Sequence, residues 1–252
     1  MLMQTFEQEL LRLQNEVLAL GGMVERSVVE SVDVLKRRDL AGAQRLTSLD
    51  QRIRKKRFAI EMDCLTLIVT QQPLDGDLRA ISSMLEIVSE LERMGDYSRD
   101  ITRTPFMIID GPLLNLLVDI HRMALTAQRM LGGALQAFVQ RDMALAQTVL
   151  AKDGEIDILY TRVHRDLLAF IRDNSQAKGN SRVLVSQARY LVRIARNLER
   201  AADQVTHICE WVAFVVTGEM ADVEPEPIPV SPNYAAGHPE AQGSSQESVL
   251  YC

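Results

Sequence analysis

Two short acidic segments are the parts of this sequence best suited to chemistry. Glu92-Arg-Met-Gly-Asp96 recurs later in the chain as Glu199-Arg-Ala-Ala-Asp203. In each segment the carboxylates are four residues apart, so on an α-helix they lie on one face and can be presented together to one ion or one partner. Clusters of carboxylate oxygens suit hard cations such as Mg, Mn, Ca and iron. The segments therefore predict two related metal sites.

The repetition extends beyond these segments. Arg38-Asp-Leu-Ala-Gly-Ala-Gln44, followed by Asp50, matches Arg141-Asp-Met-Ala-Leu-Ala-Gln147, followed by Asp153. Internal repetition over this length indicates two homologous bundles.

The elements that position the acids are predicted to be helices. The 252 residues are 47% hydrophobic but only 5% aromatic, and Leu, Ala, Val, Glu and Arg are abundant, which favours long helices over a sheet. The expected helices run over about 5–38, 40–70 and 77–104 in the first repeat and over about 113–140, 142–173 and 181–217 in the second. We therefore predict an all-α protein with two tandem homologous three-helix bundles, 1–106 and 107–217, and a tail, 218–252.

Antiparallel neighbouring helices place residues at equal distances from their shared turn side by side. By this count the acids on the second and third helices of each repeat share a level, to within a few residues of ~1.5 Å rise each. Facing carboxylates repel one another unless a positive group lies between them, which favours a metal site. Two alternatives stay open: a solvated acidic face, and ion pairs with the adjacent Arg93 and Arg200.

Charge and targeting signals bear on location. The net charge is −6, and the tail from Gly218 onward has acidic residues but no Lys or Arg. Rich in Pro, Gly and Ser, this tail is predicted to be disordered. The three cysteines lack C-x-x-C spacing, the acidic N-terminus does not resemble a signal peptide, and no apolar run approaches the ~20 residues that span a bilayer. These features predict a cytoplasmic protein.

An apolar seam follows the first helix from Phe6 to Leu35 at three- and four-residue intervals. This seam and its counterpart at 113–140 predict a surface that a homodimer buries, although the two bundles alone could also cover it.

The segment Leu91-Glu-Arg-Met-Gly-Asp-Tyr97, preceded by Gln72-Pro73 and Asp77-Leu-Arg79, resembles the PhoU family of phosphate-signalling regulators. That family repeats an E/D-x-x-x-D signature in each of two three-helix bundles. The resemblance covers about residues 5 to 216 and leaves the tail outside.

The resemblance implies a cytoplasmic, dimeric regulator that binds metal ions (Mg, Mn or Fe) through these acidic segments. It also implies partners: the ATPase of a phosphate ABC transporter and a sensor histidine kinase. The resemblance further implies that the protein represses phosphate-starvation genes when phosphate is plentiful and that it reaches the membrane only through its partners. Carried over by position, the candidate metal ligands are Asp50, Glu92, Asp96 and Asp100 in the first bundle and Asp153, Asp157, Glu199 and Asp203 in the second.

The chain departs from the family pattern at the first site. Arg54 occupies the position that Asp157 fills in the second repeat, which removes one carboxylate and places a cation where a metal would lie. In the second repeat His207 replaces the counterpart of Asp100, either as a further ligand or as a packed or solvated side chain. Arg54 predicts weaker metal binding in the first bundle.

Two other classes of function, an enzyme and an adaptor, compete with a metal-binding regulator. A ferritin-like di-iron enzyme needs Glu-x-x-His motifs, and none of the four histidines has Glu three positions before it. Two kinds of helical adaptor stay open: one that binds metal but is unrelated to phosphate, and one that binds no metal. The basic run Arg52-Ile-Arg-Lys-Lys-Arg57 comes without a helix-turn-helix pattern, so direct binding of nucleic acid is not expected.

Overall fold

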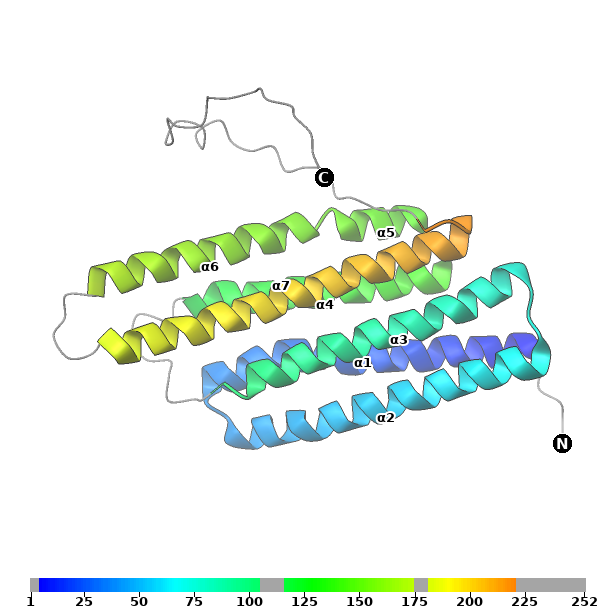
Figure 1. The fold of residues 1–252 in the computed structure, drawn as a ribbon, viewed down its shortest axis with the longest axis horizontal. Coiled ribbons are helices and arrows are strands. Elements are labelled where there is room, and N and C mark those ends of the chain that lie inside the picture. The colour runs from blue at the N-terminus through cyan, green and yellow to red at the C-terminus, as the bar shows by residue number, and fades with distance from the viewer. Residues whose placement is uncertain (1–4, 105–115, 175–180, 221–252) are drawn as a thin grey trace, which may run out of the picture.

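The computed structural model describes residues 5–104, 116–174 and 181–220, and every regular element in these ranges is a helix (Figure 1). The first repeat forms α1 (Phe6–Arg37), α2 (Leu40–Gln71) and α3 (Asp75–Thr102). The second forms α4 (Leu116–Gln140), α5 (Met143–Leu150), α6 (Asp153–Asn174) and α7 (Ser181–Thr217). The predicted all-α class is confirmed, and the predicted tail lies, from residue 221 onward, outside the described residues.

The two repeats pack into one layered bundle with a continuous core. Helices α1, α3, α4 and α7 contact one another and form the centre. Helix α2 packs outside them on α1 and α3, whereas α5 and α6 pack on α4 and α7, at the opposite edge in Figure 1. In each repeat an outer helix, α2 or α6, thus lies beside the third helix, α3 or α7. The two helices that carry the acidic residues are therefore neighbours.

The repeated Arg-Asp dipeptide forms the same turn in both repeats. Arg38 and Arg141 adopt left-handed backbone angles, with φ of 56° and 52°, and end α1 and α4. The next residue then caps the following helix: Asp39 accepts a hydrogen bond from Gly42 N, and Asp142 accepts one from Leu145 N. An N-cap carboxylate satisfies a backbone donor that the helix leaves free. The most similar stretch of the two repeats is therefore a helix boundary.

The seam of α1 is buried within the chain. Val17, Leu20 and Val24 are fully buried in the common core. The contact between the repeats is close: a Cβ added to Gly21 would lie 2.1 Å from Leu135 Cδ1. The expectation that this seam leaves a surface for a second copy is therefore wrong, because α3 and α4 already cover it.

Two expected boundaries also differ. The helix predicted over about 142–173 is interrupted between Leu150 and Asp153, where Lys152 N bonds to Val149 O and Glu155 N bonds to Lys152 O. Gly154 replaces the equivalent Gln51 of the continuous α2, which lowers the local preference for helix. Helix α3 begins at Asp75 after Leu74, so Asp77 is not its N-cap.

Within the described ranges, none of the helices combines the length and the apolar character that crossing a bilayer requires.

Candidate functional site

The acidic residues of each repeat lie between its outer helix and its third helix. We call the residues on α2 and α3 the first acidic cluster and those on α6 and α7 the second acidic cluster. The first cluster consists of Asp50, Glu92, Asp96 and Asp100, and the second of Asp153, Asp157, Glu199 and Asp203. The helical spacing that places them on one face follows from the sequence, and the antiparallel packing of neighbouring helices brings the facing pairs together.

Arg54 lies at the centre of the first cluster. Its Nε is 3.4 Å from Asp50 Oδ2, its Nη1 is 3.4 Å from Glu92 Oε1, and its Nη2 pairs with Asp96 Oδ1. Burial alone would lower the pKa of the Arg54 guanidinium, but attraction by Asp96, Asp50 and Glu92 outweighs it, so its pKa is raised. The guanidinium is therefore held in its charged form and takes the place between two helices that a metal ion was predicted to occupy.

Two further arginines, which the sequence interpretation missed, complete this network. Arg99 Nη1 lies 3.3 Å from Asp50 Oδ2 and 2.8 Å from Asp96 Oδ1, and its Nη2 lies 3.8 Å from Asp100 Oδ1. Arg57 Nε lies 2.6 Å from Glu92 Oε2, an ion pair whose N–H is too poorly aligned for a hydrogen bond. All four carboxylates of the first cluster thus face a guanidinium.

A comparison of the repeats could have identified these arginines. Arg57 aligns with Tyr160, three residues after the position of Arg54, and Arg99 aligns with Thr206, three residues after the last acid of the short segment. Spacings of three and four residues return a side chain to the same helix face. Three cations of the first repeat are therefore absent from the second.

The second acidic cluster has no such compensation. Within the part of the chain that the structure describes, none of its four carboxylates forms an ion pair or accepts a side-chain hydrogen bond, and Asp157 is exposed. Burial, followed by the charges of Asp157, Asp203 and Glu199, raises the pKa of Asp153 to about 6.

The pKa values of the other three carboxyls are raised as well. Although Asp157 is exposed as a residue, the partial burial of its carboxyl group against the packed helices raises its pKa. For Glu199, burial and then repulsion by Asp203 and Asp157 raise the pKa, against the attraction of Arg196 and Arg200. For Asp203, burial and then Asp157 raise the pKa, against His207 and Arg200. Burial is thus the first cause of all four shifts, and the charges of neighbouring carboxylates add to it for Asp153, Glu199 and Asp203.

His207 is exposed, and it acts on its surroundings through charge. It forms no ion pair with a described residue, although its field lowers the pKa values of Asp203 and of Glu90, a buried carboxyl on α3 whose pKa burial raises overall. Of the arginines beside the acidic segments, Arg93 pairs with Glu90 rather than with the first cluster. Arg200 forms no ion pair with a described residue.

The two clusters fit a metal ion differently. The second offers only oxygen donors, and a divalent cation would relieve their mutual repulsion, as hard cations do at carboxylate sites. In the first, a cation has to displace guanidinium groups. As the side chains are placed, no three or more Asp, Glu, His or Cys of the described ranges converge on one point as metal ligands. The second cluster therefore suits a metal ion by the type of its donor atoms and by its charge, and not by a preformed ligand geometry.

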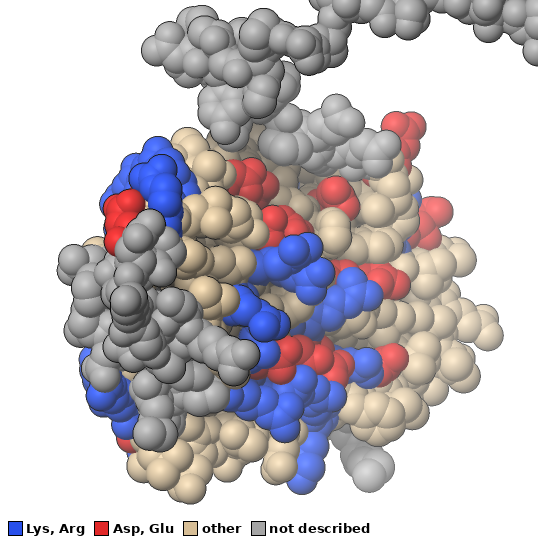
Figure 2. Space-filling view, turned by 60° about the vertical axis from the view of Figure 1, so that its left-hand side comes forward, with Lys and Arg blue, Asp and Glu red and all other residues tan. Residues whose placement is uncertain are grey.

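One face of the molecule mixes both signs of charge (Figure 2). Figure 2 shows acidic and basic side chains intermixed in a band across the molecule rather than in separate fields. Because opposite charges alternate over short distances, their fields largely cancel away from the surface, and recognition depends on local clusters.

Comparisons with known proteins agree with the repeat and the fold. The PhoU domain model matches the chain twice, at residues 17–104 and 120–212. A phosphate-specific transport system accessory protein PhoU homolog from Synechocystis sp. is 32% identical over 214 residues, which are 85% of this chain and 92% of that protein. A homolog of the same name from Clostridium acetobutylicum is 29% identical over 219 residues, which are 86% of this chain and 97% of that protein.

Solved structures are similar over the same extent. The crystal structure of PhoU from Pseudomonas aeruginosa matches with a TM-score of 0.76 at 28% identity, covering 85% of this chain and 100% of that one. The phosphate transport system regulatory protein PhoU from Streptococcus pneumoniae matches with a TM-score of 0.76 at 28% identity, covering 87% and 100%.

Proposed function

The chain belongs to the PhoU family, and on that premise we propose that it restrains phosphate uptake and phosphate-starvation signalling from the cytoplasm. Its relatives are named accessory proteins of a phosphate-specific transport system, so the chain is a regulator of phosphate transport and not an enzyme. The proposed partners are the ATPase of a phosphate ABC transporter and a sensor histidine kinase, which the protein holds silent when phosphate is plentiful.

The proposal includes metal binding, and the second acidic cluster is the observation that carries it. Four carboxyls lie between two packed helices, form no ion pair with a described residue and have raised pKa values: Asp153, Asp157, Glu199 and Asp203. A Mg, Mn or Fe ion there would supply positive charge that holds α6 against α7. In the first cluster, metal binding by Asp50, Glu92, Asp96 and Asp100 stays a prediction, with Arg54 as its competitor.

Manganese titration tests the metal part directly. Adding Mn²⁺ to chelator-treated protein, with free Mn²⁺ followed by electron paramagnetic resonance, should reveal one tight site per chain. Asp203→Asn should abolish that site, and Asp96→Asn should leave it intact. Equal loss in both variants would place the tight site elsewhere. No tight site in the wild-type protein would favour the alternative of a helical adaptor that binds no metal.

A homodimer or a partner protein is supported by an exposed apolar face on α2. Phe58, Met62, Leu65 and Val69 follow one another at four-, three- and four-residue intervals and all are exposed. Such spacing aligns them in one stripe, and aligned exposed apolar side chains mark interaction surfaces. Sedimentation velocity at micromolar concentration distinguishes a dimer from a species of the chain mass, 28.3 kDa, and the latter would leave the stripe to a different protein.

The regulatory part is tested in cells. Deleting the gene should raise expression of phosphate-starvation genes in phosphate-rich medium, because the kinase then signals as if phosphate were scarce. A reporter whose expression stays low in the deletion strain contradicts negative regulation. A pull-down from cells grown in high and low phosphate should recover the transporter ATPase or the kinase.

A further inference from the structure

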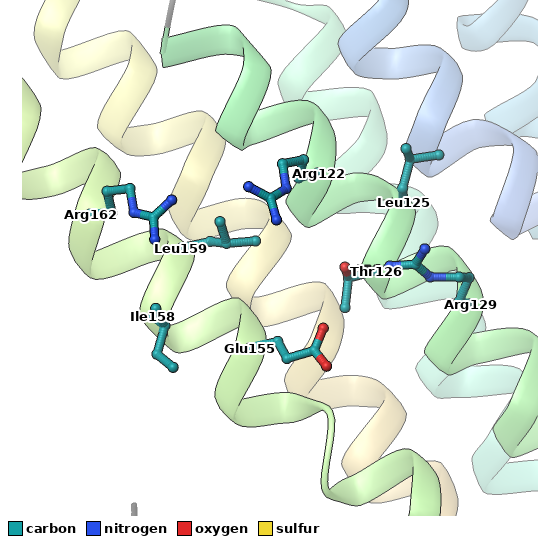
Figure 3. A pocket seen from close by; sticks show the side chains of 8 residues that line it. All are labelled: Arg122, Leu125, Thr126, Arg129, Glu155, Ile158, Leu159 and Arg162. Atoms are coloured by element: carbon teal, nitrogen blue, oxygen red, sulfur yellow. Dashed lines mark hydrogen bonds between the residues drawn. The ribbon is translucent and has the colours of Figure 1, made fainter. Parts of the chain in front are cut away.

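A second site, on the other side of α6 from the second acidic cluster, is formed where α6 faces α4. A groove of about 400 Å³ lies there, within the usual range for small-molecule sites. Its charged lining consists of three arginines, Arg122, Arg129 and Arg162, and one carboxylate, Glu155. Figure 3 shows Arg122 and Arg162 extending toward each other from the two helices. The groove thus combines excess positive charge with a hollow that is open to solvent.

The arginines retain most of their hydrogen-bonding capacity. Arg122 Nη1 and Arg162 Nη1 both approach the same oxygen, Asp119 Oδ1, at 3.7 and 3.9 Å, which is too far for a hydrogen bond. Arg129 donates only to the Thr126 hydroxyl, at 3.0 Å, and has no carboxylate partner among the described residues. A guanidinium has five N–H donors arranged to match phosphate oxygens in pairs. Asp119, which faces Arg122 and Arg162, and Glu155 in the lining leave the three guanidiniums with an excess of positive charge and with free donors for an anion.

The spacing of the arginines indicates the size of that anion. Arg122 and Arg129 are two helical turns apart on α4, a distance of ~10 Å along the axis, which exceeds the width of one phosphate group. The side chain of Leu159 lies between Arg122 and Arg162, as Figure 3 shows, and gives the groove an apolar wall. A ligand with several linked phosphate groups and a less polar part matches both features.

We propose that the α4–α6 groove binds a small oligophosphate anion, such as a nucleoside triphosphate, through Arg122, Arg129 and Arg162. This site is separate from the second acidic cluster, and its ligand needs no metal bound there. The equivalent positions of the first repeat hold Ala19 and Ala59 in place of Arg122 and Arg162, so the site belongs to the second repeat alone.

Isothermal titration of the full chain, in metal-free buffer at moderate ionic strength, tests the proposal with two probes. Adenosine triphosphate should bind saturably, and inorganic phosphate should bind at least tenfold more weakly because it can reach only one pair of guanidiniums. The double variant Arg122→Ala and Arg162→Ala, which introduces the alanines that the first repeat has at these positions, should weaken triphosphate binding at least tenfold. Arg37→Ala, which removes an exposed arginine on α1, should leave it unchanged.

A variant that is expected to bind triphosphate more tightly controls for loss of binding through misfolding. Glu155→Gln removes the negative charge of the groove and should tighten triphosphate binding severalfold, which a misfolded protein cannot do. No saturable triphosphate binding, tighter binding of inorganic phosphate than of triphosphate, or unchanged affinity in the double alanine variant would each overturn the proposal. Asp203→Asn should leave triphosphate binding intact, so this site and the metal site can fail independently.

Discussion

The first and second acidic clusters occupy equivalent places in the two repeats but balance their charge in opposite ways. In the first, Arg54, Arg57 and Arg99 lie against the carboxylates as ion pairs. In the second, the aligned positions hold Asp157, Tyr160 and Thr206, and the carboxylates repel one another. The two repeats thus share one scaffold, and the residues at three positions decide whether its carboxylates are paired within the chain.

The difference has an energetic side. A carboxylate removed from water costs several kcal/mol unless it is paired, so a guanidinium between two helices fixes them whether or not a ligand is present. In the second repeat the carboxylates have no such internal partner. A cation that bound only the folded state would add stability that grows with the logarithm of its concentration relative to its Kd. If the proposed metal site exists, the first repeat is fixed from within the chain and the second responds to the cation.

The largest expected effect comes from removing the internal cations. The Asp50 side chain is 10% exposed and has Arg54 and Arg99 as partners, so Arg54→Ala combined with Arg99→Ala leaves a buried carboxylate without compensation. We expect a loss of about 3 kcal/mol in the free energy of unfolding, measured by urea titration. Arg45→Ala, at an exposed ion pair, should change it by about 0.5 kcal/mol or less. Similar values for the two variants would mean that the ion-pair network contributes little.

Replacing the three arginines of the first cluster with the residues of the second repeat should give the first cluster the metal-binding behaviour proposed for the second. The triple variant Arg54→Asp, Arg57→Tyr and Arg99→Thr carries the residues of the second repeat, so its first cluster should gain a Mn²⁺ site. A gain of about tenfold or more in affinity there corresponds to ~1.4 kcal/mol. Equilibrium dialysis should find two bound ions per chain in place of one. A stoichiometry that stays at one in a well-folded variant would show that these positions do not govern metal binding.

The pH dependence of stability should also differ between the clusters. The pKa of Asp153 is about 6 in the folded protein, above its ordinary value of 3.8, so the folded state binds this proton more tightly than the unfolded chain does. The contribution of Asp153 to the stability of the metal-free protein should therefore become more favourable as the pH falls through about 6 toward 4, and its penalty is fully present above pH 6. Since the carboxyl is only half-buried, solvent screening reduces the effect to about 1 kcal/mol.

Asp153→Asn isolates this contribution. In metal-free buffer the variant should be more stable than the wild-type chain at pH 7.5, and the gap should close near pH 4.5, with both followed by urea unfolding. A gap that is independent of pH would assign the effect to packing rather than to charge. With Mn²⁺ present the order at pH 7.5 should reverse, because the variant loses a ligand.

Sequence alone predicted the parts of this molecule that depend on local pattern. Helical periodicity, the repeated Arg-Asp turn and the four-residue spacing of the acids all follow from the geometry of one helix. The roles of Arg57 and Arg99 were not predicted. A comparison of the repeats marks both positions, but their pairing with acids of the facing helix depends on the level at which α2 meets α3. The burial of the α1 seam was not predicted because it requires the docking of one repeat on the other, and the break at Lys152 depends on a small local balance around Gly154.

The smallest expected effect concerns an arginine present in both repeats. Arg93 and Arg200 each follow the first acid of their segment, but Arg93 pairs with Glu90, and Arg200 forms no ion pair with a described residue and is exposed. Arg200 only moderates the raised pKa values of Glu199 and Asp203. Arg200→Ala should therefore change Mn²⁺ affinity by less than about twofold, and 0.5 M salt should remove the difference, because an exposed charge is screened. Competition dialysis against the wild-type chain resolves such a change. Arg200→Ala could instead alter Mn²⁺ affinity as much as the exchange at Arg54 does. Metal affinity would then depend on an arginine's proximity in sequence to the acids rather than on its placement between the helices. The contrast drawn between the two clusters would be wrong.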